Sequence, residues 1–238
     1  MVSQITLGGI VVDVMLKDIK NIHLSVYPPT GRVRISAPLR MSLDTIRVFA
    51  ISKIGWIKQQ QTKLARQERE TPREYLDRES HYVWGRRYLL QVVEREGAPG
   101  VELKHNKMVL RIRPGADDGA KRRAVEDWYR AEVKAAAPAL IAKWEPLLGV
   151  NVARFFVQRM KTKWGSCAAE TRSIRLNTDL AKKPPECLEY IVVHEMVHLV
   201  VRHHDAKFIG LMDRCLPSWG MLRQILNDAP LAHADWLY

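Results

Sequence analysis

Two histidines and a glutamate lie close together in residues 191–204, which read IVVHEMVHLVVRHH. His194 and His198 are four residues apart, so on a helix their imidazoles would lie one turn apart on the same face, where both can bind one cation. Glu195 would point about 100° away from His194 and could act on a water molecule bound to that cation. This spacing is typical of zinc hydrolases.

The residues around this motif predict a helix that runs through the protein core. Almost all other side chains between residues 188 and 201 are apolar, as expected of a buried helix. Pro184 and Pro185 suit the first turn of such a helix, where a missing N–H costs little. An ionised Glu195 buried between two imidazoles is costly unless a cation compensates its charge. A bound metal is therefore favoured over two core histidines that are satisfied by hydrogen bonds.

The third metal ligand is expected just beyond this helix. A catalytic zinc ion usually has three protein ligands and keeps its fourth position for water. His203 and His204 are the candidates, because a turn after the helix would bring either of them back to the metal. His204 is favoured, and His203 is the alternative that could instead be a solvated turn residue. Asp205 can cap a second helix after the turn.

Three segments, in this order, resemble a known family. They are RMKTKWGSC at residues 159–167, SIRLN at residues 173–177 and KKPPECLEYIVVHEMVHLVVRHHDAKF at residues 182–208. Together they resemble the YgjP-like zinc-dependent hydrolases, relatives of the SprT-like metallopeptidases, strongly over residues 152–219 and more loosely before them. The resemblance implies a zincin-type core in which His194, His198 and His204 bind the metal and Glu195 is the catalytic base.

The WGSC segment is predicted to lie beside the active-site cleft, in a β-hairpin next to the HExxH helix. Apolar residues predict strands near residues 152–160 and 174–176, with the polar residues 168–172 as a turn. In zincins such an edge strand can pair with an extended substrate, and Gly165 would allow its close approach. The alternative is that Trp164 anchors the core and Gly165 forms a bulge. We expect substrate contacts from Lys161, Lys163, Trp164, Gly165, Ser166 and Arg175.

Composition limits the class of protein. A chain of 238 residues can bury a sizeable core as one large domain or two small lobes. Three scattered cysteines do not make a disulfide scaffold, which indicates a reducing compartment. The first residues lack the pattern of a signal peptide, and no run approaches the 18 apolar residues of a membrane span. We therefore expect a soluble cytoplasmic protein.

Positive charge is concentrated in the amino-terminal half. Residues 1–115 contain 20 Lys and Arg against 11 Asp and Glu, so they contribute +9 of the total net charge of +12. Weak binding of nucleic acid or another polyanion is one hypothesis. A solvated basic surface is the simpler interpretation, because the sequence contains no clustered motif for reading RNA or DNA.

The element pattern indicates the α+β class, with a β-rich lobe at residues 1–115 and a zincin-like catalytic lobe at residues 116–238. A helix capped by Ser42 should continue to about Ile57. A long helix should follow the PGADDG segment and be interrupted or kinked near Pro138. We find no internal repeat. Strands are predicted at residues 10–15, 22–26, 33–36, 81–84, 88–93, 101–104 and 108–113.

Three functions fit this pattern. A metallopeptidase with a zinc-bound water activated by Glu195 is favoured. A nucleoside triphosphate pyrophosphohydrolase is the second, because activities of this kind have been suggested within the YgjP-like family and a polyphosphate would use the basic residues expected at the cleft. A DNA-associated SprT-like protease is the third, with DNA bound by the basic amino-terminal half. The basic residues expected at the cleft are Arg159, Lys161, Lys163 and Arg175.

For a peptide, the carbonyl oxygen becomes negatively charged as water attacks and needs a donor besides the metal. The sequence does not rank the candidates for this donor, which are Tyr190, His203, Lys163 and Arg159.

Overall fold

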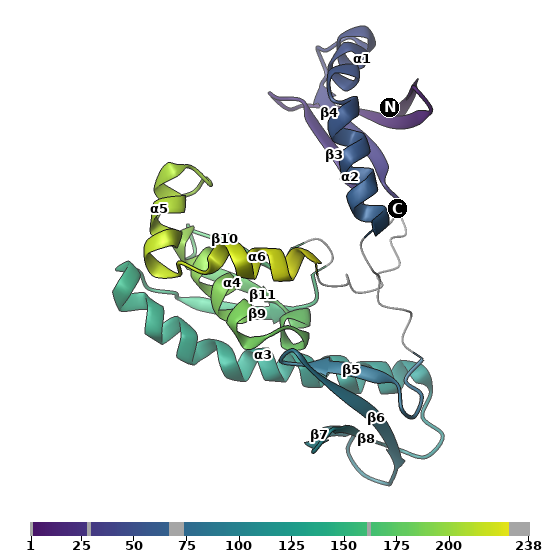
Figure 1. Cartoon of the computed structure of the whole chain (residues 1–238), viewed down its shortest axis with the longest axis vertical. Helices are drawn as coiled ribbons and strands as arrows, with labels where there is room; N and C mark the ends of the chain where they lie inside the picture. The colour runs from purple at the N-terminus through teal and green to yellow at the C-terminus, as the bar shows by residue number, and fades with distance from the viewer. Residues whose placement is uncertain (1, 28–29, 67–73, 161–162, 229–238) are drawn as a thin grey trace. The chain divides into compact units, whose positions relative to one another are not determined.

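The computed structural model describes residues 2–27, 30–66, 74–160 and 163–228 (Figure 1). The described residues form two compact units, 2–66 and 74–228, and each unit has its own hydrophobic core. This division differs from the boundary expected near residue 115. The strands just before residue 115 belong with the HExxH helix, because Leu90, Met108 and Leu110 are buried in the same core as that helix.

The first unit contains a four-stranded sheet in the order β1-β2-β4-β3. β2 and β4 are parallel, and the two outer pairs are antiparallel. Three of these strands were predicted, whereas β1 was missed because only Ile5 and Leu7 mark its buried face. The strands are β1 (Val2–Leu7), β2 (Ile10–Lys17), β3 (His23–Tyr27) and β4 (Arg32–Pro38).

Two helices, α1 (Leu43–Ser52) and α2 (Ile54–Arg66), pack on one face of this sheet. Ser42 caps α1 as predicted, because its hydroxyl accepts a hydrogen bond from the Thr45 N–H. The predicted single helix is in fact two, since Lys53 leaves the helical conformation with φ −107° and ψ 4°.

The second unit begins with a sheet in the order β5-β6-β8-β7. Its strand order and the sense of each pair are the same as in the first sheet. The two sheets therefore share one topology, although the sequence shows no repeat. The strands are β5 (Ser80–Val83), β6 (Arg86–Glu94), β7 (Gly100–Lys104) and β8 (Lys107–Ile112).

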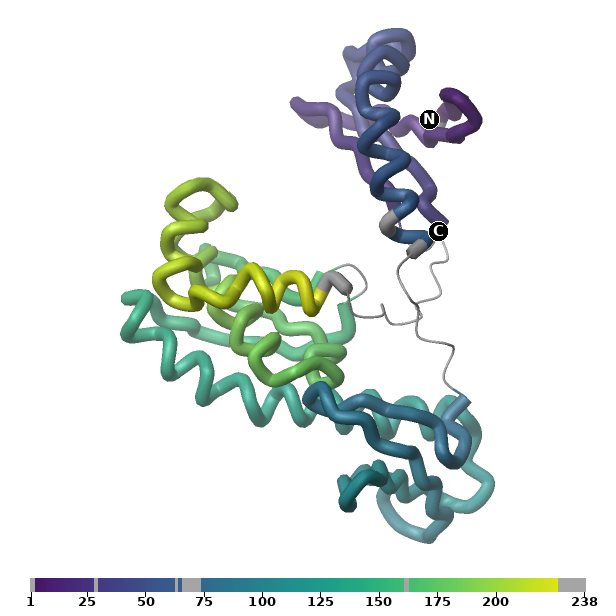
Figure 2. Tube along the Cα trace, in the orientation of Figure 1, coloured from purple at the N-terminus to yellow at the C-terminus, as the bar shows by residue number. Residues whose placement is uncertain are grey.

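A long helix, α3 (Asp118–Leu148), follows this sheet. It begins at Asp117, whose carboxylate accepts a hydrogen bond from the Ala120 N–H at 2.6 Å. Pro138 lies inside this helix, so the predicted interruption does not occur there, while the alternative of a kink stays a prediction. Figure 2 shows the helix as one continuous coil. A buried stripe that includes Val133, Ala137 and Ile141 offsets the backbone hydrogen bond that the proline removes.

The remaining elements surround the HExxH motif. The strands β9 (Arg154–Gln158), β10 (Gly165–Ala168) and β11 (Ser173–Asn177) form a sheet in the order β10-β11-β9. β10 and β11 make the predicted hairpin, and β9 pairs with β11 in parallel, so β11 is central and β10 and β9 are the two edge strands. A 3₁₀ turn, η1 (Thr178–Lys182), leads into three helices. These are α4 (Pro185–Val197), α5 (Ala206–Cys215) and α6 (Trp219–Asp228).

None of the helices in the described residues combines the length and the apolar character needed to cross a membrane.

Candidate metal and catalytic site

The start of α4 is held in place by the turn between β5 and β6. The Trp84 N–H donates a hydrogen bond to the Ala181 carbonyl at 2.7 Å. Gly85 has a φ of +77°, which favours glycine, and a Cβ there would lie 3.1 Å from the Pro184 side chain, tighter than an ordinary contact. Further along α4, its apolar side chains are buried against α3 and α6. These contacts anchor the helix that carries His194 and Glu195.

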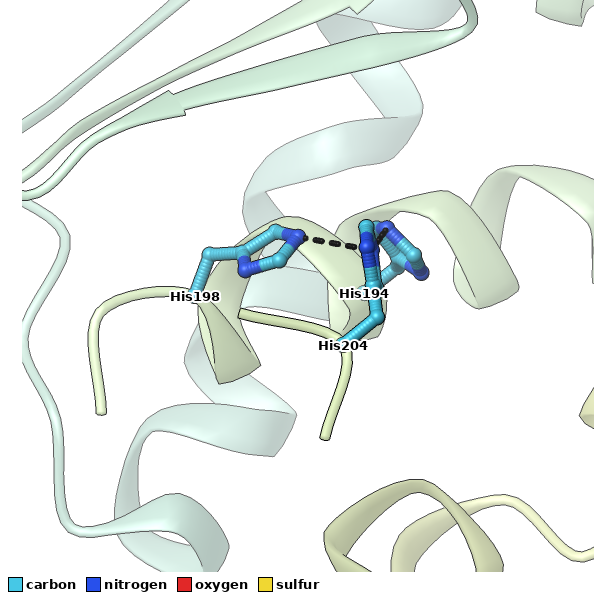
Figure 3. A group of neighbouring side chains, drawn as sticks. All are labelled: His194, His198 and His204. Atoms are coloured by element: carbon cyan, nitrogen blue, oxygen red, sulfur yellow. Dashed lines mark hydrogen bonds between the residues drawn. The ribbon is translucent and has the colours of Figure 1, made fainter. Parts of the chain in front are cut away.

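Three histidine side chains converge at the end of α4 (Figure 3). The Nε2 atom of His204 lies 3.1 Å from Nε2 of His194 and 3.1 Å from Nε2 of His198. In a tetrahedral zinc site with Zn–N distances of about 2.0–2.1 Å, two ligand nitrogens are about 3.3 Å apart. The three nitrogens therefore fit a zinc ion. Among the described residues His203 does not join this group.

Neighbouring residues orient these imidazoles. The Val201 carbonyl lies 3.0 Å from Nδ1 of His198, and because a carbonyl oxygen can only accept, Nδ1 carries the proton and Nε2 keeps its lone pair. Phe208, in the first turn of α5, packs against all three rings with centroid distances of 4.6–5.0 Å. Asp205 caps α5 as predicted and so places Phe208 there, since its carboxylate accepts from the Phe208 N–H at 3.0 Å.

The electrostatics of the site favour neutral histidines. Burial lowers the pKa of His194 to about 3, and the nearby His198, His204 and Arg223 act in the same direction. Burial also lowers the pKa of His198. Both imidazoles are therefore uncharged at pH 7, which is the form that binds a metal.

Glu195 lies next to the histidines and is 5% exposed. Burial raises the pKa of its carboxyl group to about 7, although the positive charge of Lys163 opposes this rise. A carboxyl group with this pKa can both accept and return a proton near neutral pH, as a general base must.

Strand β10 passes directly beside Glu195. A Cβ on Gly165 would lie 2.6 Å from Oε1 of Glu195 and 2.8 Å from its Cγ. The pairing of β10 with β11 is regular from residue 165 to 168, so Gly165 permits a close approach and is not a bulge. The Asn177 N–H donates to the Trp164 carbonyl at 2.9 Å. Because backbone groups alternate in direction along an antiparallel strand, those of Gly165 and Cys167 point away from β11.

A cavity opens over the three histidines and Glu195. Four predicted substrate contacts line it, namely Lys163, Trp164, Gly165 and Ser166. Trp164 also packs against the core, so it combines the two roles that the sequence left open.

Two other predicted contacts are not found at the cavity. Arg175 does not line it, and its guanidinium lies 5.8 Å from the centroid of the Phe156 ring. Its neighbours in β11, Ile174 and Leu176, are fully buried, so Arg175 is on the opposite face of the sheet. Lys161 lies outside the described residues.

The charged residues around the cavity also differ from the expectation. Arg159 is paired with Glu126 of α3 at 2.8 Å and does not line the cavity. Arg202 and Arg223, which sequence reasoning missed, do line it. No spacing rule connects Arg223 with the motif, because α6 reaches the site only through tertiary packing.

A comparison with models of protein families identifies the family of this chain. The profile described as "YgjP-like, metallopeptidase domain" matches residues 20–229. The chain belongs to the YgjP-like family. The resemblance found in the sequence is thus confirmed, and a metallopeptidase-type hydrolase with a divalent metal, usually zinc, is supported at the level of the family.

Two solved structures are similar to part of this YgjP-like chain. One is the metallopeptidase zymogen abylysin of Pyrococcus abyssi, with 18% identity, a TM-score of 0.34, 37% of this chain covered and 87% of the other. The other is the zymogen jannalysin of Methanocaldococcus jannaschii, with 21% identity, a TM-score of 0.34 and coverages of 38% and 92%. A comparison with curated proteins gave no match.

Replacing Gly165 by Ala in this YgjP-like protein is expected to lower kcat by about 10²-fold, since a shift of about 1 Å in a reacting group can cost that much. The added methyl group would overlap the Glu195 carboxylate and displace it. Zinc content should not change, because Gly165 is not one of the three converging ligands. Gly210→Ala in α5 is the matched control, because nothing lies within 4 Å of a Cβ there. Wild-type kcat in Gly165→Ala would contradict the position assigned to the base.

The raised pKa of Glu195 predicts a pH-dependent stability of the metal-free protein. Between its usual value of 4.5 and the folded value of about 7, folding favours the protonated carboxyl group. Above pH 7 the ionised form costs the folded state up to about 3 kcal/mol, and below pH 4.5 this cost disappears. Glu195→Gln should therefore raise Tm at pH 8 but not at pH 4.5. Thermal unfolding with a chelator present tests this, and a Tm difference independent of pH would contradict it.

Proposed function

We propose that this chain is a zinc-dependent metallopeptidase in which His194, His198 and His204 bind the metal and Glu195 is the general base. The observation that carries the proposal is the convergence of three Nε2 atoms next to a buried carboxyl group with a pKa of about 7. Zinc, when bound, would lower the pKa of a water ligand to about 7 and polarise the substrate carbonyl.

Glu195 would move the proton during the reaction. Its carboxylate takes a proton from the attacking water, while the water oxygen forms a bond with the carbonyl carbon of the substrate. The protonated carboxyl group then gives this proton to the amide nitrogen, and the C–N bond breaks. The close contact with Gly165 holds the carboxylate in place for both transfers.

The outer strand β10 supports a peptide as the substrate. The backbone groups of Gly165 and Cys167 point away from β11, so an extended peptide could pair with them. Such pairing would hold the scissile bond beside Glu195, since β10 contacts this residue directly.

A nucleoside triphosphate is the second candidate substrate. Lys163, Arg202 and Arg223 line the cavity and could bind phosphate groups. Two of the basic residues that motivated this hypothesis, Arg159 and Arg175, do not line it. The third hypothesis, a DNA-associated protease with weak nucleic-acid binding, stays a prediction. It depends on the basic excess of residues 1–115, where 20 Lys and Arg stand against 11 Asp and Glu; residues 1–66 of the first unit hold 10 and 3 of these.

One set of activity assays distinguishes the two candidate substrates. Zinc-loaded wild type and Glu195→Gln are incubated with an unfolded casein-like protein and with each nucleoside triphosphate. We expect fragments of the protein with wild type and far fewer with the variant. Release of pyrophosphate that depends on Glu195, without proteolysis, would overturn the proposal in favour of the second candidate.

A further inference from the structure

Tyr190 lies on α4 one turn before His194, on the side of the metal ligands away from Glu195. Successive residues of a helix are about 100° apart around its axis. Measured from Tyr190, His194 lies at about 40°, His198 at about 80° and Glu195 at about 140°. The two histidines of α4 therefore lie between the base and the tyrosine. If water attacks a substrate carbonyl group from the side of Glu195, the carbonyl oxygen would lie on the other side of the histidines, near Tyr190.

The Tyr190 side chain is buried but still reaches the cavity. It is 4% exposed and yet lines the cavity. Its ring makes an edge contact with the His194 imidazole at a centroid distance of 5.8 Å. No hydrogen bond from the described part of the chain occupies its hydroxyl group. A tyrosine hydroxyl keeps its proton at neutral pH and can donate it to a substrate oxygen.

Arg223 of α6 supplies a positive charge near Tyr190. Leu222 and Leu226, one turn apart, are 4% and 2% exposed and hold α6 against α4. Arg223 lines the cavity, and its charge acts on both Tyr190 and His194. No ion pair within the described residues neutralises this guanidinium.

The other candidate donors lie elsewhere. Arg159 is paired with Glu126, and His203 does not line the cavity. Lys163 lines the cavity two residues before Gly165, which contacts Glu195, so Lys163 is on the side of the base. Of the candidates that the sequence left open, Tyr190 thus lines the cavity on the helix face away from the base. Arg202 and Arg223 add positive charge to the lining, and the charge of Arg223 acts on Tyr190.

We propose that Tyr190 and Arg223 bind the substrate carbonyl oxygen as it becomes negatively charged. This inference rests on the proposed function. The hydroxyl and the guanidinium would stabilise the transition state more than the bound substrate, because the oxygen carries its full charge only after water has attacked.

The test uses Tyr190→Phe, which keeps the ring contact with His194, and Arg223→Met, each loaded with zinc. Each substitution should lower kcat for peptide cleavage by about 10²–10³-fold, as expected for loss of one oxyanion donor, with KM changed much less. Calorimetry with a phosphinic peptide, whose anionic tetrahedral group mimics the charged oxygen, should show weaker binding by a similar factor. Zinc content should stay at the wild-type level.

Two controls separate this role from a structural one. Tyr82→Phe and Arg214→Met remove the same groups at exposed positions and should leave kcat and phosphinic-peptide affinity unchanged. An uncleaved peptide should bind equally to Glu195→Gln with and without Tyr190→Phe, because the ground-state carbonyl carries no full charge.

The outcomes are distinct. If wild type cleaves peptide and Glu195→Gln does not, the proposed function stands. Wild-type kcat and wild-type phosphinic-peptide affinity in both Tyr190→Phe and Arg223→Met would then overturn this inference alone. Absence of any peptide cleavage by zinc-loaded wild type would overturn the proposed function, and this inference with it.

Discussion

Glu195→Gln is expected to lower kcat for peptide hydrolysis by about 10²–10⁴-fold, the usual contribution of a general base. The amide keeps the shape of the side chain between Gly165 and the histidines but cannot accept the proton of water. The variant should still bind one zinc per chain, since Glu195 is not one of the three converging ligands. Steady-state kinetics together with elemental analysis of the same sample measures both properties.

Glu186→Gln is the matched control for this substitution. Glu186 lies in the first turn of the same helix and is exposed, so its amide should change neither kcat nor zinc content. Comparable activity in wild type and zinc-loaded Glu195→Gln would mean that Glu195 has only a structural role.

His194→Ala is expected to remove zinc and to lower thermal stability. With only two imidazoles left, the site no longer has the three protein ligands that catalytic zinc usually takes. The bound metal also stabilises the folded state, because ligands that bind only this state raise the free energy of unfolding. Dialysed His194→Ala should therefore contain less than about a tenth of a zinc per chain and unfold near the Tm of chelated wild type or below it.

Two further substitutions identify the third ligand. His204→Ala should lose zinc as His194→Ala does, whereas His203→Ala should keep it, because His203 does not join the converging group. Full zinc occupancy in the double variant His194→Ala and His198→Ala would show that the metal binds elsewhere.

The sequence predicted the parts of the site that depend on local spacing. His194 and His198 share one side of α4 because they are four residues apart. Asp205 caps α5 through a local hydrogen bond, which positions Phe208 next to the histidines. Each of these relations spans less than two helical turns, so it can be derived from the order of residues alone.

The sequence also contained a signal that went unused. Arg175 stands between Ile174 and Leu176, and if both of these are buried, a strand must direct Arg175 to its other face. Applying this alternation would have removed Arg175 from the predicted cleft residues.

Other features depend on tertiary packing and could not be predicted from the sequence. Arg223 comes to the cavity because Leu222 and Leu226 pack α6 against the core of the second unit. The division of the chain likewise depends on which core buries Leu90 and Leu110, and the turn-forming PGADDG segment near residue 115 does not report this. Such contacts join residues that are far apart in the chain.

The most direct test of the central claim is peptide hydrolysis in water enriched in ¹⁸O. Wild type and Glu195→Gln, each with one zinc per chain, are incubated with an unfolded protein. The masses of the fragments are then measured by mass spectrometry. We expect wild type to produce fragments with one ¹⁸O atom in each new terminal carboxylate, and Glu195→Gln to produce almost none. Equal amounts of labelled fragments from both proteins, or none from either, would contradict a zinc peptidase that uses Glu195 as its base.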